Sequence, residues 1–175
     1  MRHSHAACIG SRSYLVNRIG LCYIPYITNH NATDGADRMS PDKQNKLYAD
    51  YPELFRQKDF ESNRTLMGQG IAVGDGWCQI VADLCEDIQK HTDAVMESDP
   101  DFKHPEYFQI KNSYGELRIQ LMDHTPSIED FVEKAKKAAR VTCESCGEPG
   151  EERAFRGWHK VTCLKCHNKI PFWQL

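Results

Sequence analysis

Two cysteine pairs near the C-terminus constrain the fold more than any other feature of this sequence. Cys143 and Cys146 form the first CxxC pair, Cys163 and Cys166 form the second, and sixteen residues separate the pairs. A spacing of two residues lets one tight turn direct both sulfurs at a single tetrahedral ion, and two such turns supply four thiolates. The four cysteines are therefore predicted to bind one Zn²⁺ ion. Two disulfides, or four unrelated thiols, are the alternatives.

The shortness of the cysteine-bearing segment supports a bound metal. Residues 141–175 are too few to bury a hydrophobic core of their own, so the segment needs another source of stability. A structural zinc ion contributes on the order of 10 kcal/mol to the folding of finger-sized peptides. Because four cysteines leave no coordination position for water or substrate, the predicted Zn²⁺ is structural.

Composition indicates a soluble globular protein. The chain has 175 residues, of which 40% are hydrophobic and 27% are charged, as in typical globular domains. The longest apolar run, residues 19–27, is about half of what a membrane span requires. No secretory signal is evident, so we expect a cytoplasmic location, reduced thiols and no membrane partner.

Hydrophobic patterning divides the chain into three parts. Residues 1–38 lack a clear period and are predicted to be a poorly ordered extension. Residues 39–140 are predicted to form an α+β domain, with amphipathic helices packed on a small antiparallel hairpin. Residues 141–175 are predicted to form a zinc ribbon or treble clef. Only three residues separate the last predicted helix from Cys143, so the zinc module should pack against the domain.

The first two helices of the domain have clear local signals. A short helix is predicted over residues 41–50, before Tyr51-Pro52. A longer helix is predicted to begin with Asp75 as its N-cap and to run towards Met96. Its apolar residues recur at helical spacing and define a core face: Trp77, Ile80, Val81, Leu84 and Ile88.

A hairpin and a third helix follow. Residues 107–111 and 116–122 alternate apolar and polar side chains, with turn formers between them, and predict two antiparallel strands. The third helix is predicted to begin at Thr125-Pro126-Ser127, with Ser127 and Asp130 in capping-box spacing. Two ion pairs at i,i+4 spacing are predicted on its surface: Asp130 with Lys134, and Glu133 with Lys137.

Cations and aromatic residues are interleaved between the two cysteine pairs. They are Arg153, Phe155, Arg156, Trp158 and Lys160. Such a segment can bind nucleic acid, because rings stack on bases and cations bind phosphates. The alternative is that Phe155 and Trp158 form the small core of the zinc module. From Phe131 onward the chain has nine basic and five acidic residues, which predicts a mild attraction for phosphate.

Other reactive residues give weaker signals. Asp123-His124 and His167 resemble parts of the HNH type of metal-dependent nuclease, but that family places its doublet between the cysteine pairs, and here Asp123-His124 precedes both. Cys78 and Cys85 lie two turns apart on a predicted helix, about 10 Å along its axis, which is too far for a disulfide. They are interpreted as apolar core residues. No catalytic residue is assigned.

Two family resemblances bear on function. Residues 143–149 and 163–166 resemble the zinc finger of the TraR/DksA group of transcription factors, which act on RNA polymerase. A broader resemblance is to small, uncharacterised proteins of bacteriophages and bacterial mobile elements. It rests on segments that recur in this order: Gly74-Asp75-Gly76-Trp77, Lys111 with Tyr114-Gly115-Glu116-Leu117-Arg118, Cys143 to Gly150, and Gly157-Trp158 to Cys163. The resemblance implies a phage-like origin, a bacterial host cell and a zinc-ribbon or treble-clef end.

These features predict macromolecular binding rather than turnover. The leading hypothesis is nucleic-acid or transcription-linked binding through the cations and aromatics between the cysteine pairs. The second is a phage-encoded inhibitor of a host defence protein, which would use an acidic helix face (Asp83, Glu86 and Asp87) and the apolar tail, residues 170–173. The same tail could instead join two copies as a homodimer. An HNH-like nuclease is the third hypothesis.

Overall fold

The computed structural model describes residues 15–16, 22–23, 38–61, 64–155 and 158–169. The chain divides into two compact units, Met1–Thr33 and Asp34–Leu175. In the first unit, strand β1 (Leu15–Val16) pairs antiparallel with β2 (Cys22–Tyr23). Residues 1–38 are predicted to be poorly ordered, and most of them lie outside the described residues. The core and the cysteine cluster belong to the second unit.

The second unit begins with a helix that has the predicted bounds, α1 (Pro41–Asp50). Three short 3₁₀ helices follow: η1 (Arg56–Asp59), η2 (Met67–Gln69) and η3 (Asp75–Trp77). Within the connection that precedes η3, Ile71 and Val73 are fully buried. Between them, Ala72 bonds to both Ile110 and Asn112. A segment that has no hydrophobic period therefore forms part of the core.

The long helix α2 (Cys78–Ser98) buries the predicted face. Val81, Leu84 and Ile88 are buried, as is Trp77 in the preceding turn, whereas Ile80 is partly buried. The prediction that Asp75 caps this helix is wrong. Its carboxylate Oδ1 instead accepts a hydrogen bond of 2.6 Å from the backbone N–H of Ser40, at the start of α1.

The predicted hairpin is confirmed as strands β3 (Glu106–Ser113) and β4 (Glu116–Met122). Its turn is shorter than predicted, because β3 continues to Ser113 and only two residues connect the strands. Both have positive φ, 56° for Tyr114 and 79° for Gly115, as in the type I′ turns that fit the twist of a hairpin.

Helix α3 (Pro126–Ala139) buries Ile128, Val132, Ala135 and Ala139. Thr125, not Ser127, is its N-cap residue, so the predicted capping box is wrong. The reason is Pro126, which takes the first helical position because its missing N–H needs no partner there. The two predicted i,i+4 pairs are also replaced: Lys134 pairs with Asp87 of α2, and Lys136 pairs with Glu133.

The cysteine module follows α3 directly. It contains strands β5 (Glu151–Phe155) and β6 (Trp158–Thr162), which pair antiparallel, and the short helix α4 (Leu164–His167). The apolar tail at residues 170–173 lies outside the described residues. With helices and small antiparallel sheets, the chain has the predicted α+β fold.

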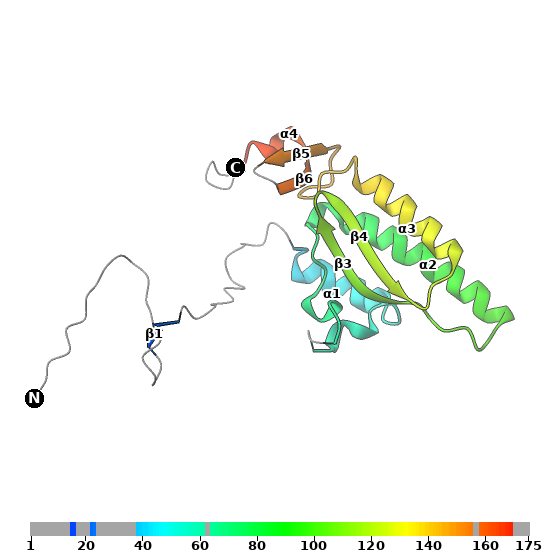
Figure 1. Cartoon of the computed structure of the whole chain (residues 1–175). Coiled ribbons are helices and arrows are strands. Elements are labelled where there is room, and N and C mark those ends of the chain that lie inside the picture. Colours follow the sequence, from blue (N-terminus) through cyan, green and yellow to red (C-terminus); the bar gives the residue numbers. More distant parts are fainter. Residues whose placement is uncertain (1–14, 17–21, 24–37, 62–63, 156–157, 170–175) are drawn as a thin grey trace, which may run out of the picture. The chain divides into compact units, whose positions relative to one another are not determined.

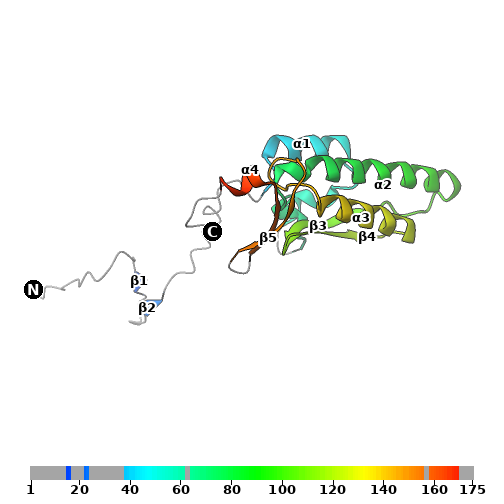
Figure 2. The same ribbon diagram turned by 90° about the horizontal axis from the view of Figure 1, so that it is seen from above.

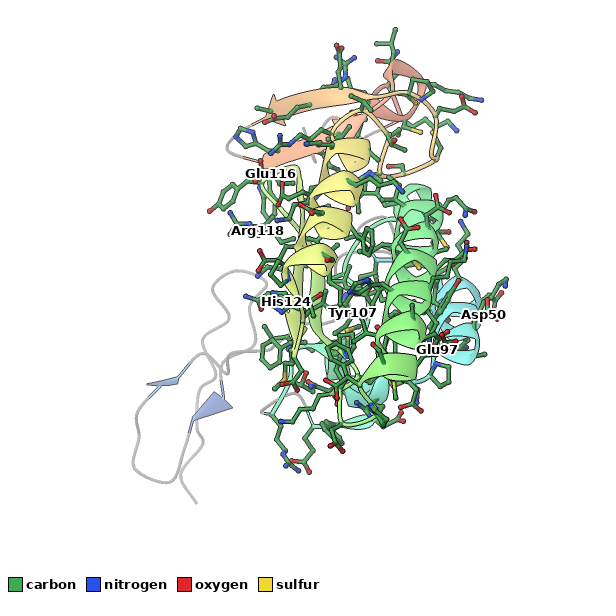
Figure 3. The ribbon with its side chains drawn as sticks, turned by 90° about the vertical axis from the view of Figure 1, so that its right-hand side faces the viewer. Asp50, Glu97, Tyr107, Glu116, Arg118 and His124 are labelled. Atoms are coloured by element: carbon green, nitrogen blue, oxygen red, sulfur yellow. The ribbon has the colours of Figure 1, made fainter. Side chains whose placement is uncertain are left out.

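The elements of the second unit surround one core. Figures 2 and 3 show α2 between α1 and α3, and Figure 1 shows the β3–β4 hairpin lying along these helices. Tyr107 of β3 is completely buried and contacts Phe55, with ring centroids 5.0 Å apart. Val161 of β6 belongs to the same core, so the module is continuous with the domain. No described helix combines the length and hydropathy that crossing a membrane requires.

The bond between Asp75 and Ser40 should stabilise the start of α1. Burial alone would raise the pKa of the Asp75 carboxyl, but bonds from Ser40 and Lys43 outweigh it and hold this pKa below its ordinary value. We expect Asp75→Ala to lower the free energy of unfolding by about 1 kcal/mol in urea titrations at pH 7. Asp101→Ala, at an exposed carboxylate that has no ion pair within the described residues, is the control. Equal stability of the two variants would contradict this role.

Candidate metal centre

The structure brings the four predicted ligands together. The Sγ atoms of Cys143, Cys146, Cys163 and Cys166 all lie within 4.8 Å of one another. The Cys146 and Cys163 sulfurs are 3.7 Å apart, much longer than a disulfide bond of about 2.05 Å. Four thiolates at about 2.3 Å from a tetrahedral ion are separated by about 3.8 Å. The cluster therefore has the dimensions of a metal site.

A tight turn after α3 provides the first two ligands. The N–H of Gly147 donates to the Cys143 carbonyl at 2.9 Å, and the N–H of Cys143 donates to the Glu148 carbonyl at 2.7 Å. Gly147 has a φ of 83°, a conformation that residues with a Cβ rarely adopt. This turn, residues 143–147, is called the knuckle below. It places Cys143 in the interior and leaves Cys146 exposed.

The beginning of α4 provides the other two ligands. Cys163 is the N-cap residue, and its sulfur accepts a hydrogen bond from the Cys166 N–H at 3.4 Å. This bond lowers the pKa of the Cys163 thiol to about 7. Burial and the neighbouring thiols raise the pKa of Cys166 to about 12. Four adjacent sulfurs do not ionise together without a cation, so metal binding here releases protons and weakens as the pH falls.

A buried glutamate joins the knuckle to the domain. Glu144 is fully buried, and its Oε1 accepts a hydrogen bond of 3.1 Å from the Gly74 N–H. Its Oε2 accepts one of 2.6 Å from the side-chain amide of Asn112 in β3. A buried carboxylate must be hydrogen-bonded to avoid a large desolvation penalty. Glu144 therefore fixes the position of the knuckle on the domain.

The backbone before α2 approaches the knuckle so closely that a side chain would not fit. A Cβ added to Gly76 would lie 2.2 Å from the Cys143 carbonyl oxygen and 2.4 Å from the Gly147 nitrogen. The indole Nε1–H of Trp77 donates to the Thr142 carbonyl at 2.8 Å. These contacts confirm that the module packs against the domain, as its short connection to α3 predicts.

The predicted contact residues lie on the β5–β6 hairpin. Arg153 pairs with Lys160 across the two strands, and Phe155 pairs with Trp158. Trp158 is 81% exposed, so it does not form the core of the module; Val161 and Thr162 are buried instead. Arg153 forms an ion pair with Glu151, and Lys160 also has an interaction partner. Arg156 and the side chain of Phe155 lie outside the described residues.

The structure does not bring the nuclease-like residues together. His124 follows the end of β4, and its Nε2 lies 3.1 Å from the carboxylate of Glu129 in α3. The other end of β4 meets the cysteine module, where a Cβ at Gly115 would contact His159. Seven strand residues span about 20 Å, which separates Asp123-His124 from the cysteines.

The thiols of α2 also fit a structural role. Cys85 is buried, and burial raises the pKa of its thiol to about 12. Its sulfur lies 3.5 Å from the Tyr107 hydroxyl. A protonated thiol in the core is a poor nucleophile.

Two residues of the site occur in the sequence only within longer recurring segments, with no local signal of their individual roles. Glu144 looks like an ordinary acidic residue within the knuckle, and only the approach of Gly74 and Asn112 shows that it is buried. Tyr114 looks like one turn residue among several, yet its side chain is 73% exposed and its ring lies 6.3 Å from that of His159. The hairpin turn β3–β4 thus meets the cysteine module.

Comparison with known proteins finds no matching family model, no similar curated protein and no similar solved structure. The function is therefore inferred from the geometry of the site itself.

The cysteine cluster should hold one equivalent of metal in the purified protein. We expect Cys146→Ser to lower the metal affinity by more than about 100-fold, because even residues outside the ligand shell of metal sites contribute 10–100-fold. Metal content after dialysis against a chelator is the measurement. Cys78→Ser, at a half-buried cysteine of α2, is the matched control and should retain the metal. Full metal occupancy in Cys146→Ser would contradict the assignment.

Adding one methyl group at Gly76 should displace the knuckle. Because its Cβ would overlap backbone atoms, we expect Gly76→Ala to lower the free energy of unfolding by about 1–3 kcal/mol or more. Metal affinity should fall as well. Ser145→Ala, an exposed position in the knuckle, should change neither quantity. If Gly76→Ala matched this control in both measurements, the knuckle would not be packed on the domain as described.

Proposed function

We propose that this protein binds nucleic acid through the β5–β6 hairpin, and that a structural Zn²⁺ ion holds the hairpin in place. Four thiolates in a tetrahedral arrangement favour zinc or an iron–sulfur centre, and Zn²⁺ is the ion that closed four-cysteine sites of this spacing bind most commonly. Elemental analysis of the purified protein identifies the ion.

The arrangement of the module supports a treble clef rather than a zinc ribbon. The first cysteine pair lies on a knuckle, a two-stranded hairpin follows, and the second pair lies at the start of α4. A zinc ribbon would place the second pair on another knuckle. Figure 1 shows β5 and β6 beside α4, and the exposure of Trp158 leaves one face of the hairpin available for contact.

The exposure of Trp158 is the observation that carries the proposal. Alternate residues of a strand share one face, so Trp158 and Lys160 lie on the same face of the hairpin as Arg153 on the neighbouring strand. An indole that is 81% exposed loses the stabilisation that burial would give it. Beside two cations, it provides a stacking surface for a base and adjacent groups for phosphates.

The alternative of a host-protein inhibitor has less support from the described residues. Of the acidic residues on α2, Glu86 pairs with Lys90, Asp87 pairs with Lys134, and Asp83 accepts a hydrogen bond from Gln79. These partners reduce the charge available to a basic protein. Two further parts of the proposal rest on the family resemblances alone. They are that the protein acts on transcription in a bacterial host and that it has a phage-like origin.

The proposal predicts salt-dependent binding that needs Trp158. We expect a fluorescently labelled oligonucleotide of mixed sequence to bind with a Kd that rises steeply with salt concentration. Trp158→Ala should weaken binding by at least about fivefold, since one stacked base contributes about 1–3 kcal/mol. Leu164→Ala, at an exposed apolar residue of the same module, is the matched control and should bind normally.

Lys160→Glu provides a second variant, for which we expect weaker binding and a smaller salt dependence. If the wild-type protein binds no DNA or RNA at low salt, the proposal is wrong. Salt-insensitive capture of a single protein from a nuclease-treated bacterial lysate would then support the inhibitor instead.

A further inference from the structure

The turn of the β3–β4 hairpin has an unusual residue at its first position. Tyr114 has a φ of 56°, a left-handed conformation in which a bulky side chain is strained. Turns of this type favour Asn-Gly or Gly-Gly. Packing does not compensate, because the Tyr114 side chain is 73% exposed. A strained and exposed aromatic residue is unfavourable for stability, which points to a role outside folding.

A second unfavourable feature lies on the same hairpin. Lys111 and Arg118 are directly opposite each other in the strand register, where like charges destabilise a sheet. Neither side chain forms an ion pair with any residue that the structure describes. The adjacent pair in the register, Asn112 and Leu117, lies on the other face of the hairpin. Asn112 points towards Glu144 and Leu117 towards the core. The two cations therefore lie on the outer face, and Figure 3 shows Arg118 with Glu116 on the side of β4 away from α2.

A groove beside β4 extends this cationic surface. It has a volume of about 360 Å³ and is lined by strand residues together with residues of α3. Its charged residues are Lys111, Arg118, Lys136, Arg140, Glu116 and Glu133. Glu133 pairs with Lys136, and Glu116 pairs with Arg140. The charges that remain without a counter-ion among the described residues are those of Lys111 and Arg118.

The β3–β4 turn lies against strand β6 and is held by the knuckle. The Tyr114 ring contacts the ring of His159, the residue after Trp158. The Gly115 N–H donates to the side-chain oxygen of Asn112 at 2.9 Å. Asn112 in turn donates to Glu144 in the knuckle at 2.6 Å. The metal-bound module thus fixes the turn that presents Tyr114.

We propose that the β3–β4 hairpin provides the second half of the nucleic-acid site: Tyr114 stacks on a base, Lys111 and Arg118 bind phosphates, and the ligand is single-stranded. This inference rests on the proposed function of the β5–β6 hairpin. Among the described side chains, each hairpin has an exposed aromatic residue near its turn, Tyr114 or Trp158, and a pair of opposed cations further along its strands. The exposed rings of Tyr114 and Trp158 reach base faces only where bases are unpaired, because the faces are covered in a duplex.

The test uses the full-length, metal-bound protein and three changes at one position. Tyr114→Asn removes the ring but suits the left-handed turn conformation, so this variant should be at least as stable as the wild type. Tyr114→Phe and Tyr114→Trp keep a ring. Each protein is titrated against a labelled single-stranded oligonucleotide, in DNA and RNA versions, and against the matching DNA duplex, while thermal unfolding monitors the fold.

We expect Tyr114→Asn to weaken single-strand binding by at least about fivefold, and the two aromatic variants to bind within about twofold of the wild type. The double variant Lys111→Gln, Arg118→Gln should reduce the slope of log Kd against log salt by about 1.4, the value for two phosphate contacts on a single strand. Lys103→Gln, at an exposed lysine outside both hairpins, should leave the slope unchanged.

The outcomes separate the two proposals. If Trp158→Ala weakens binding but Tyr114→Asn does not, the β5–β6 site stands and the inference about β3–β4 is wrong. Equal affinity for the duplex and the single strand would overturn the assignment of a single-stranded ligand. A wild-type protein that binds neither form would overturn the proposed function, and the inference with it.

Discussion

The packing of the knuckle against the domain is the contact on which the rest of the structure depends. Residues 143–147 must curve so that two sulfurs face the second cysteine pair, and this curve directs backbone atoms towards Gly76. The approach leaves no room for a Cβ. Glu144 fills the remaining space and is hydrogen-bonded to Gly74 and Asn112. The cysteine cluster, a buried carboxylate and two glycines therefore depend on one another, because a change in any of them alters the same interface.

This interface also places the two hairpins side by side. The β5–β6 hairpin lies between the two cysteine pairs, and the β3–β4 turn is bonded to the knuckle through Asn112. Trp158 and Tyr114 are both exposed, although an indole would be more stable in a core and a turn former would suit the position of Tyr114 better. Stability alone does not explain these choices. The ligand that we propose, single-stranded nucleic acid, has flat apolar groups and negative charges that would suit both.

Much of the local structure follows from local patterns. Helix α1, the hairpin β3–β4 and the apolar face of α2 are predicted because periodic side chains and turn residues act over a few positions. The predictions of helix caps fail where a distant residue, or the residue next in the chain, decides the local hydrogen bonding. Asp75 is a good N-cap residue, but the N–H of Ser40, 35 residues earlier in the chain, competes successfully for its carboxylate. Ser127 fails as a cap because Pro126 already occupies the first turn.

The sequence by itself determined the α+β class and the set of four cysteines, because helical and strand periods and the CxxC spacing are properties of short segments. It left open whether Trp158 is a core residue or a contact residue, since an aromatic side chain suits both roles. Only the tertiary structure showed that Trp158 is not a core residue, because it buries Val161 of the same strand and leaves Trp158 in solvent. The burial of Glu144 and the exposure of Tyr114 were likewise decided by the structure. Each depends on which distant segments come within hydrogen-bonding or van der Waals distance, and no local pattern encodes that proximity.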